Sequence, residues 1–323
     1  MEFRTLPKTG LKVSRLSLGT MTLGSQTDEA TAQCIVDCCL DSGINSVDTA
    51  NVYNGGAAET IVGRALKGRR DRVILASKAG IKMGDAPDEQ GLSRASLHKA
   101  IDATLRRLGT DYVDIYYLHL PDYSTPIEET LEAMEDLVRA GKVRFPATSN
   151  YAAWQIAEII CMCEKRGYQG YFISQPMYNL LARGIEEEYL PFCERFGVAV
   201  FPYNPLAGGM VTGKHSRQSG PTPGTRFDGN KMYQDRYWLA EDFAAVEELR
   251  SIARDAGKTL VELAIQWMLS QTAVDSIILG ASRLDQLQQN LKAAEGGPLD
   301  ASVLARCDAV WKPLRGVTPK YNR

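Results

Sequence analysis

Four residues with side chains suited to acid–base chemistry stand where short apolar segments of the chain end. Asp48 lies near the end of INSVDT, Lys78 ends RVILASK, and His119 ends VDIYYLH. Tyr53 follows the first of these segments closely. Such short apolar runs are typical of strands that are buried on both faces. The strands of a parallel α/β barrel end on one common face, so we expect the four side chains to lie together.

These four residue types fit the reduction of a carbonyl group. A free tyrosine hydroxyl has a pKa of about 10, and we expect the ammonium of Lys78 to lower the pKa of Tyr53. A buried lysine needs a partner, which Asp48 would supply. His119 would position a substrate oxygen and donate to it. Such a pocket protonates the alkoxide that forms when hydride adds to a carbonyl. No side chain carries hydride, so a nicotinamide cofactor is implied.

Each of these residues also has an ordinary structural explanation. A strand-end pair of Asp48 and Lys78 can stabilise a fold, and Tyr53 can pack in a loop. A histidine such as His119 is often a hydrogen-bonded core residue. The occurrence of all four at the ends of three successive predicted strands favours the functional interpretation.

Composition limits the possible classes of protein. The chain has 323 residues, of which 44% are hydrophobic, and its net charge is −2. A near-neutral chain with interleaved charges lacks the basic surface of a nucleic-acid-binding protein. No apolar run reaches the roughly 18 residues of a membrane span, and no signal-peptide segment begins the chain. We therefore expect a cytoplasmic protein without a membrane partner. Both a monomer and a homo-oligomer are compatible with the sequence.

The seven cysteines and three histidines do not predict a metal site. The cysteines are irregularly spaced and lack paired C-x2-C motifs, so we expect reduced thiols that pack as small apolar groups. A metal-dependent barrel hydrolase would need clustered histidine and carboxylate ligands, and no H-x-H pair is present.

The order of segments predicts one (β/α)8 TIM barrel over residues 1–323, because strand and helix alternate eight times without a linker. We expect an N-terminal hairpin in 1–14 that covers the barrel floor, a long loop at 211–237 after the seventh strand, and extra helices near the C-terminus before an irregular tail. An open doubly wound sheet is the alternative, but its cofactor site needs G-x-G-x-x-G between strand and helix. The predicted strands are 15–20, 44–49, 72–78, 112–119, 142–150, 171–179, 198–209 and 275–282. The predicted helices are 28–43, 57–68, 93–109, 127–141, 154–167, 185–197, 241–257, 259–271, 283–294 and 300–311.

Polar residues also end the later predicted strands. Ser149 and Asn150 end the fifth strand, and Gln175 ends the sixth. Their amide and hydroxyl groups could hold a carboxamide, and Tyr203 on the seventh strand could stack on a flat ring. The alternative is that these groups only satisfy the strand ends.

The segment LGASRLDQLQQN carries a possible phosphate site. Ser282-x-x-Asp285 resembles a capping box. Arg283 is predicted in the first turn of the following helix, where the macrodipole disfavours a cation. An anion bound at the helix N-terminus would explain that position, because a guanidinium matches a phosphate. This interpretation favours NADPH, whose additional 2′-phosphate needs such a site.

Seven segments along almost the whole chain together resemble the aldo-keto reductase superfamily. They are DTANVYNGGAAETIVGRAL, RVILASKAG, DYVDIYYLHLPD, SNYAAWQIAEI, QPMYNLL, YNPLAGGMVTGK and LGASRLDQLQQNL. YNPLAGGMVTGK and the following GTRFDGN resemble the branch of aflatoxin-aldehyde and succinic-semialdehyde reductases. The potassium-channel β subunits are similar in their cofactor groove and are expected to be more distant relatives.

The resemblance implies an (α/β)8 barrel, an extended NADP(H) and a small aldehyde or ketone substrate. It implies Tyr53 as general acid and base, with Asp48, Lys78 and His119 as its partners. The implied cofactor contacts are Gly19, Thr20, Met21, Asp48, Ser149, Asn150, Gln175, Tyr203, Asn204, Pro205, Leu206, Ala207, Lys214, Arg226, Gly280, Ser282, Arg283, Gln286, Gln289 and Asn290.

One departure and one alternative follow from the resemblance. Relatives commonly read R-Y-x-G-V-S-N in the fifth strand, whereas this chain has Pro146, which removes a ladder donor. We therefore expect disturbed geometry before Ser149. The alternative function is a cofactor-sensing accessory subunit like the channel β subunits, which keep the same four residues. The chain length and the lack of an N-terminal extension weigh against it.

Overall fold

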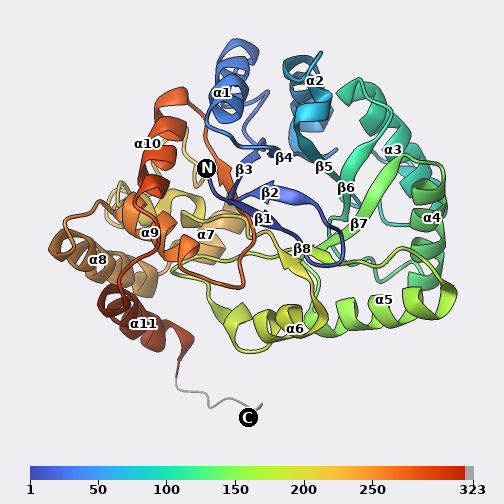
Figure 1. Ribbon diagram of the computed structural model, residues 1–323. Coiled ribbons are helices and arrows are strands. Elements are labelled where there is room, and N and C mark those ends of the chain that lie inside the picture. Colours follow the sequence, from blue (N-terminus) through green and yellow to red (C-terminus); the bar gives the residue numbers. More distant parts are fainter. Residues whose placement is uncertain (317–323) are drawn as a thin grey trace.

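The computed structural model describes residues 1–316 and shows a barrel of eight strands with helices around it (Figure 1). The end of the predicted tail, 317–323, lies outside the described residues. Neighbouring strands are parallel and follow the chain order, with β10 beside β3. The predicted (β/α)8 barrel is therefore confirmed. Its strands are β3 (Leu16–Gly19), β4 (Ser46–Asp48), β5 (Ile74–Ala79), β6 (Val113–Leu118), β7 (Val143–Ser149), β8 (Ile173–Gln175), β9 (Ala199–Val200) and β10 (Ile277–Gly280).

Backbone hydrogen bonds close the barrel between β9 and β10. The amide of Asp275 donates to the carbonyl of Val200 at 2.9 Å, and the amide of Ile278 donates to the carbonyl of Pro202 at 3.0 Å. Closure brings the carboxyl ends of all the strands to one face, where a barrel of this type carries its chemistry.

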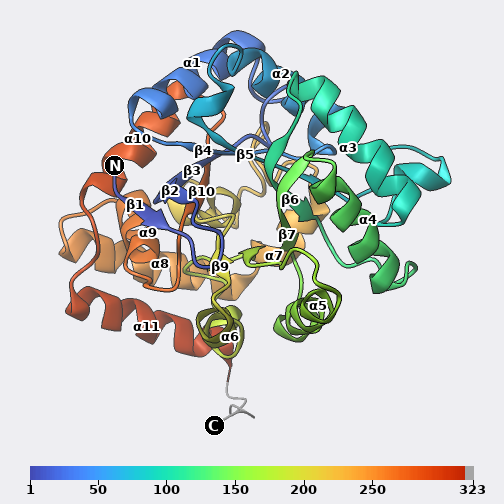
Figure 2. The same ribbon diagram turned by 45° about the vertical axis from the view of Figure 1, so that its right-hand side comes forward.

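Helices surround the barrel (Figure 2), and their ends follow local sequence signals. Ser93 caps α3 by accepting from the amide of Ser96, and Gly109 ends that helix in the left-handed region with φ 63°; a glycine there avoids the Cβ penalty. The helices are α1 (Glu29–Asp41), α2 (Ala57–Ala65), α3 (Arg94–Leu108), α4 (Ile127–Arg139), α5 (Ala153–Arg166), α6 (Tyr189–Phe196), α7 (Lys231–Tyr237), α8 (Ala240–Asp255), α9 (Leu260–Leu269), α10 (Leu284–Glu295) and α11 (Ala301–Arg315). Short 3-10 turns are η1 (Tyr53–Gly56), η2 (Arg70–Arg72), η3 (Pro87–Glu89), η4 (Gly184–Glu186) and η5 (Ala207–Thr212).

The N-terminal hairpin closes one end of the barrel, as predicted. Strands β1 (Phe3–Thr5) and β2 (Lys12–Ser14) pair in antiparallel register, and Figure 1 shows them lying across that end. Leu6 and Val13 of the hairpin are buried in the same apolar cluster as Ile115 and Phe201 from the barrel interior. The floor is therefore sealed by apolar side chains, which leaves the opposite face for a ligand.

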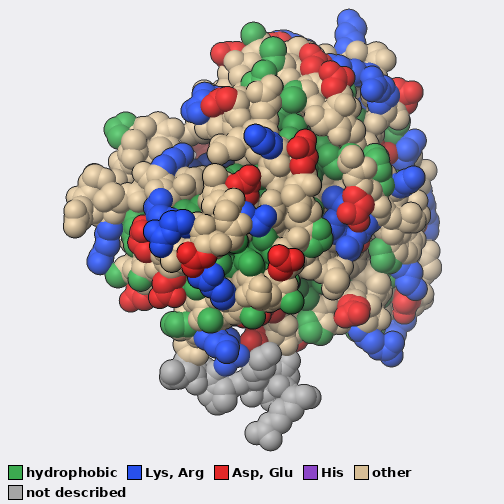
Figure 3. Space-filling model, turned by 60° about the vertical axis from the view of Figure 1, so that its left-hand side comes forward, with side chains coloured by type: hydrophobic (Ala, Val, Ile, Leu, Met, Phe, Trp, Pro, Cys, Tyr) green, Lys and Arg blue, Asp and Glu red, His purple; other side chains and the backbone are tan. Residues whose placement is uncertain are grey.

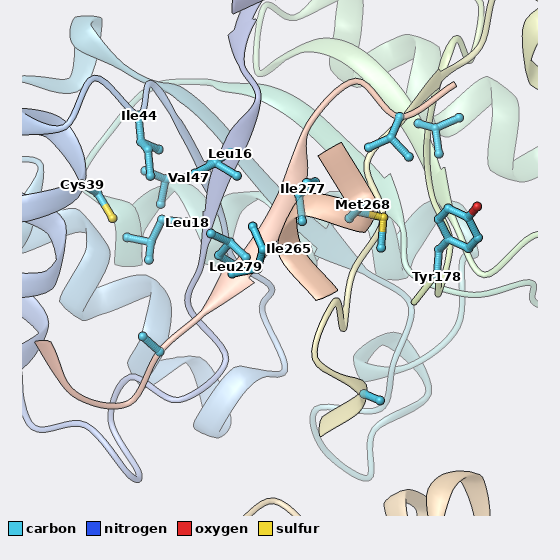
Figure 4. Close-up of a cluster of buried hydrophobic side chains, with 14 of the residues drawn as sticks. Leu16, Leu18, Cys39, Ile44, Val47, Tyr178, Ile265, Met268, Ile277 and Leu279 are labelled. Carbon is cyan, nitrogen blue, oxygen red and sulfur yellow. The ribbon is translucent and has the colours of Figure 1, made fainter. Parts of the chain in front are cut away.

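A second apolar layer lies between the strands and the helices. Figure 4 shows Leu16 and Leu18 of β3 near Leu279 of β10, with Ile265 of α9 beside Leu279 and Met268 of α9 beside Ile277. On the surface shown in Figure 3, basic and acidic side chains are interspersed rather than gathered in one patch. No helix within residues 1–316 combines the length and apolar character that a membrane crossing requires.

The sequence predicted a loop over the whole segment 211–237, but part of this segment is helical. Its last seven residues form α7, where the side chain of Asn230 accepts from the amide of Tyr233. Tyr233 and Tyr237, four residues apart, are both buried on one side of this helix. Burial of two aromatic rings at helical spacing outweighs the surrounding Gly and Pro content.

Pro146 does not disturb the fifth barrel strand, contrary to expectation. β7 runs unbroken from Val143 to Ser149, and Pro146 faces Tyr116 of β6 in regular register. The β8 ladder begins only at Thr148. Proline lacks a backbone N–H, and at Pro146 this causes no loss, because β8 does not yet pair with β7 at that position.

Candidate active site

The ammonium of Lys78 lies at the centre of the site, at the carboxyl end of β5. It donates to Asp48 Oδ1 at 2.5 Å, to the carbonyl of Thr49 at 2.8 Å and to the hydroxyl of Tyr53 at 3.3 Å. Lys78 is fully buried and Asp48 is 5% exposed. An ammonium has three hydrogen-bond donors, so each donor of this buried cation has an acceptor.

The turn that carries Tyr53 is held in an unusual backbone conformation. Asn54, Gly55 and Gly56 all have positive φ, of 52°, 63° and 92°. The side-chain amide of Asn54 donates to the carbonyl of Leu23 at 2.6 Å, which ties the turn to the loop after β3. A Cβ on Gly56 would lie 2.8 Å from Cδ of Arg107. A side chain at Gly56 would be strained, because the position combines a left-handed φ with a close contact to the Arg107 side chain.

His119 completes the group from the end of β6. Its ring meets the ring of Tyr53 edge-on, with centroids 6.0 Å apart. Burial, with the charge of Lys78, lowers the pKa of His119 to about 3, so the imidazole is neutral at pH 7. Its Nδ1 atom is buried and has no hydrogen-bond partner among residues 1–316. Such an unpaired buried atom is unusual in folded proteins.

The pKa of Tyr53 moves in the opposite direction to the one expected from the sequence. Burial raises the pKa of its hydroxyl, and the attraction of Lys78 offsets only part of that rise. For Lys78, burial alone would lower the pKa of the ammonium, but Asp48 and Tyr53 together raise it. At neutral pH the site therefore holds a charged Lys78 beside a protonated Tyr53, which is the form of a general acid.

Hydrogen bonds link the later strand ends to this centre. Gln175 Nε2 donates to Asp48 Oδ2 at 2.7 Å, and Ser149 Oγ donates to the carbonyl of Gln175 at 3.0 Å. The side-chain amide of Asn150 donates to the carbonyl of His119 at 2.9 Å, while the hydroxyl of Tyr203 donates to Asn150 Oδ1 at 2.8 Å. The structure thus gathers these predicted carboxamide contacts around Asp48 and His119.

The loop after β9 forms a tight turn with several left-handed residues. Asn204 and Ala207 have φ of 66° and 50°, and Gly208 and Gly209 continue with 68° and 101°. The amide of Gly208 donates to Asn204 Oδ1 at 2.6 Å. The predicted contacts Pro205 and Leu206 lie inside this turn. Successive backbone amides in such a turn form a cradle of the kind that holds anions.

The end of β10 differs in detail from the sequence prediction. Arg283 is the N-cap residue of α10 rather than a member of its first turn. Its guanidinium is exposed and pairs with Asp285 at 2.9 Å. The predicted capping box of Ser282 and Asp285 does not form, because the hydroxyl and the amide of Ser282 both donate to Gln286 Oε1 at 3.0 Å.

Lys214 faces another cation instead of an acid. Burial, with the charge of Arg283, lowers the pKa of the Lys214 ammonium. Within residues 1–316 no carboxylate forms an ion pair with Lys214. Two neighbouring cations, of which only Arg283 is paired with a carboxylate within residues 1–316, suit a phosphate group.

The remaining predicted contacts lie at the end of β3 and in the loop after it, in the segment before α7, at the end of β10 and on α10. A Cβ on Gly19 would lie 2.8 Å from Ile278, and Thr20 Oγ1 donates to the carbonyl of Asp48 at 2.9 Å. Arg226 Nη1 donates to the sulfur of Met21 at 2.9 Å, so the loop before α7 bridges to the loop after β3. Gly280 and Gln289 are exposed, whereas Asn290 is buried.

Tyr233 and Arg236 of α7 lie close to the candidate site, although the sequence did not predict them as site residues. Arg226 donates to the hydroxyl of Tyr233 at 3.3 Å, and Tyr233 lies close enough to Tyr53 and Tyr203 to affect the pKa of both. Arg236 counteracts the rise that burial causes in the pKa of Tyr203. The spacing of Tyr233 and Tyr237 was the available signal, and it was hidden within a predicted loop.

Comparison with known proteins decides the family. The model of the Aldo/keto reductase family matches residues 15–312. The chain belongs to the aldo/keto reductase family. This confirms the predicted superfamily and supports an oxidoreductase that uses a nicotinamide dinucleotide on a carbonyl substrate.

Individual relatives of this aldo/keto reductase carry two kinds of name. The chain is 37% identical to human aldo-keto reductase family 7 member A3, covering 95% of this chain and 96% of that protein. It is 36% identical to rat aflatoxin B1 aldehyde reductase member 2, covering 95% and 87%. It is 39% identical to a probable voltage-gated potassium channel subunit beta of Arabidopsis thaliana, covering 93% of each. These identities do not support the expectation that the channel subunits are more distant.

Proposed function

We propose that this aldo/keto reductase reduces aldehyde or ketone groups of small molecules to alcohols with NADPH, and that Tyr53 is its general acid. The observation that carries this proposal is the position of the Lys78 ammonium. It is held by Asp48 at 2.5 Å and reaches the hydroxyl of Tyr53 at 3.3 Å. A cation beside a phenol stabilises the phenolate that remains after proton transfer.

Each of the four residues has a distinct part in the proposed reaction. When bound, the dinucleotide supplies the hydride for the carbonyl carbon. Tyr53 gives its hydroxyl proton to the carbonyl oxygen, and Lys78 stabilises the phenolate until a solvent proton replaces the lost one. Neutral His119 hydrogen-bonds the same oxygen and orients it. Asp48 keeps Lys78 charged and aimed at Tyr53.

The residues around this centre suit the two ends of the dinucleotide. Ser149, Asn150 and Gln175 would hold the carboxamide, and Tyr203 would stack on the nicotinamide ring. The turn Asn204–Ala207 and Lys214 would hold the pyrophosphate. Lys214 and Arg283 support a preference for NADPH, because the charge of Arg283 acts on the Lys214 ammonium, and two neighbouring cations suit a phosphate. The further proposed contacts are Gly19, Thr20, Met21, Arg226, Gly280, Ser282, Gln286, Gln289 and Asn290.

A second candidate function is a cofactor-sensing accessory subunit. The 39% identity to the Arabidopsis channel β subunit supports it, and the four central residues do not distinguish the two functions. An accessory subunit would bind NADPH without rapid turnover of common carbonyl compounds.

A substrate panel separates these candidates. Purified protein is incubated with NADPH or NADH and with aldehydes, ketones and keto-sugars, and cofactor absorbance is followed. The reductase proposal predicts substrate-dependent NADPH oxidation and slower oxidation of NADH. Tight NADPH binding without turnover of any compound would favour the accessory subunit.

A further inference from the structure

A pocket outside the barrel is lined by several cationic side chains. None of its lining residues is among the catalytic or cofactor-binding residues proposed above. It has a volume of about 760 Å³ and lies between the C-terminal parts of α2 and α3. Its lining reaches Leu75 near the start of β5, whereas Lys78 lies toward the opposite end of that strand. We call it the α2–α3 pocket. It is therefore separate from the candidate active site.

The side chains around the α2–α3 pocket carry one sign of charge. Its lining contains no aspartate or glutamate, and it contains five cationic residues: Arg64, Lys67, Arg70, Arg106 and Arg107. The sequence RALKGRRDR, residues 64–72, supplies three of them and two more cations nearby, within a chain whose net charge is −2. The charge balance of the whole protein does not explain this concentration.

Three of the five cations already have carboxylate partners beyond the lining. Arg64 pairs with Glu29 at 2.8 Å, and Arg70 pairs with Asp114 at 2.7 Å. Arg107 pairs with the buried Glu59 at 2.7 Å.

Lys67 and Arg106 differ from these three. Both are exposed, and in the described part of the chain neither has a carboxylate partner; Arg106 donates only to the carbonyl of Asp102 at 3.2 Å. The negative end of a helix macrodipole favours cations in a last turn. That effect accounts for Arg106 on α3, but Lys67 lies beyond the end of α2.

We propose that the α2–α3 pocket binds a small phosphate-bearing anion through Lys67 and Arg106. Its volume is within the range of small-molecule sites, roughly 300–1,000 Å³. Guanidinium and ammonium groups on opposite walls match a ligand with two anionic groups. The pocket and the proposed dinucleotide site share no residue, so both ligands can be bound at the same time.

Arg107 is unsuitable for testing this proposal. Besides its bond to Glu59, it packs against Gly56 in the turn that carries Tyr53, and Glu59 accepts from Ser77 beside Lys78. Changing Arg107 would disturb the candidate active site. Lys67 and Arg106 can be changed without breaking an ion pair, so they are the informative positions.

Calorimetric titration of the full chain with inorganic pyrophosphate at low ionic strength tests the proposal. We expect a saturable component that weakens about tenfold in Lys67→Ala and in Arg106→Ala, as for the loss of a charged hydrogen bond. Arg195→Ala is the matched control, since Arg195 is an exposed cation in the last turn of α6. Lys214→Ala should leave this component unchanged.

Other outcomes would overturn the proposal. They are the absence of saturable heat, equal weakening by Arg195→Ala, or loss of the heat only in Lys214→Ala, which would place the anion in the cofactor groove. Tighter binding of malonate than of pyrophosphate would show a carboxylate site instead of a phosphate site.

Discussion

The ammonium of Lys78 lies 3.3 Å from the hydroxyl of Tyr53 and 5.0 Å from the centre of its ring. One cation thus donates to the acidic group and also lies within cation–π range of the ring of the same side chain. The position of Tyr53 depends on both the end of β5 and the left-handed turn η1. Changes in this turn should therefore affect the reaction, as changes in the reacting groups do.

The left-handed turn can be tested with two neighbouring glycines. Gly56→Ala would place a Cβ 2.8 Å from Arg107, whereas a Cβ at Gly55 would meet nothing within 4 Å. Both changes carry a left-handed strain of about 1–2 kcal/mol. We expect only Gly56→Ala to move Tyr53 as well, with carbonyl reduction falling by about 10²-fold. Urea unfolding and NADPH-dependent turnover measure the two effects. Equal loss of activity in both variants would contradict the proposed role of the Arg107 contact.

Cofactor selection is expected to depend on Arg283. We predict that Arg283→Ala weakens NADPH binding about tenfold. This loss is at the low end of the range for a charged hydrogen bond, because the guanidinium is exposed and already paired with Asp285. NADH binding should remain within about twofold of the wild-type value. Asp285→Ala is the complementary variant and should strengthen NADPH binding at low salt. Fluorescence titration with both cofactors measures these constants. Equal weakening of NADPH and NADH by Arg283→Ala would remove the 2′-phosphate from this position.

The segment before α7 is expected to close over the cofactor. Lys214 and Arg217 are exposed there, and Arg226 bridges to Met21 at 2.9 Å. We predict that trypsin cuts first between residues 211 and 230 and that NADP⁺ slows this cleavage at least about fivefold, since bound ligands order such loops. Cleavage sites are identified by mass spectrometry, with cuts elsewhere as the internal control. A cutting rate that ignores NADP⁺ would show that this segment does not cover the cofactor.

Asp242 should make stability fall as pH rises toward neutrality. Burial raises the pKa of this carboxyl from 3.8 to about 7. The folded protein therefore holds the proton more tightly than the unfolded chain, so the contribution to stability is complete below about pH 4 and is lost by about pH 7. Asp242→Asn should remove this loss, and its melting temperature should gain a few degrees over wild type between pH 5 and pH 8. Glu241→Gln, at the exposed neighbour, is the control. A pH-independent difference between Asp242→Asn and wild type would refute the assigned pKa.

Periodicity and strand-end residues predicted most of the fold. The order of the eight strands, the hairpin floor and the ends of α3 at Ser93 and Gly109 occur as local patterns predicted. The sixth and seventh strands are shorter than predicted, since β8 spans Ile173–Gln175 and β9 only Ala199–Val200. These features depend on short-range chemistry that is visible in a single sequence. The helix α7 was missed because burial of Tyr233 and Tyr237 comes from distant parts of the chain.

The details of the candidate site were less predictable. The sequence placed Lys78 near Tyr53, but the rise in the pKa of Tyr53 depends on how completely the surrounding side chains exclude water. Likewise, Arg283 pairs with Asp285 because the chain is extended at Arg283. Partner choice at a helix end depends on backbone angles that residue types alone do not determine.

Tyr53→Phe tests the central claim most directly, because it removes only the hydroxyl that Lys78 contacts. NADPH affinity and melting temperature should stay close to wild type, while carbonyl reduction falls by about 10²–10⁴-fold, the usual contribution of a general acid. Lys78→Met should lower reduction similarly, and the double variant should be little worse than either, because the two groups act as a unit. Single-turnover reduction of the best aldehyde at saturating NADPH is the measurement. Near-normal turnover of Tyr53→Phe with intact NADPH affinity would contradict the account and leave His119 as the next candidate for the proton donor.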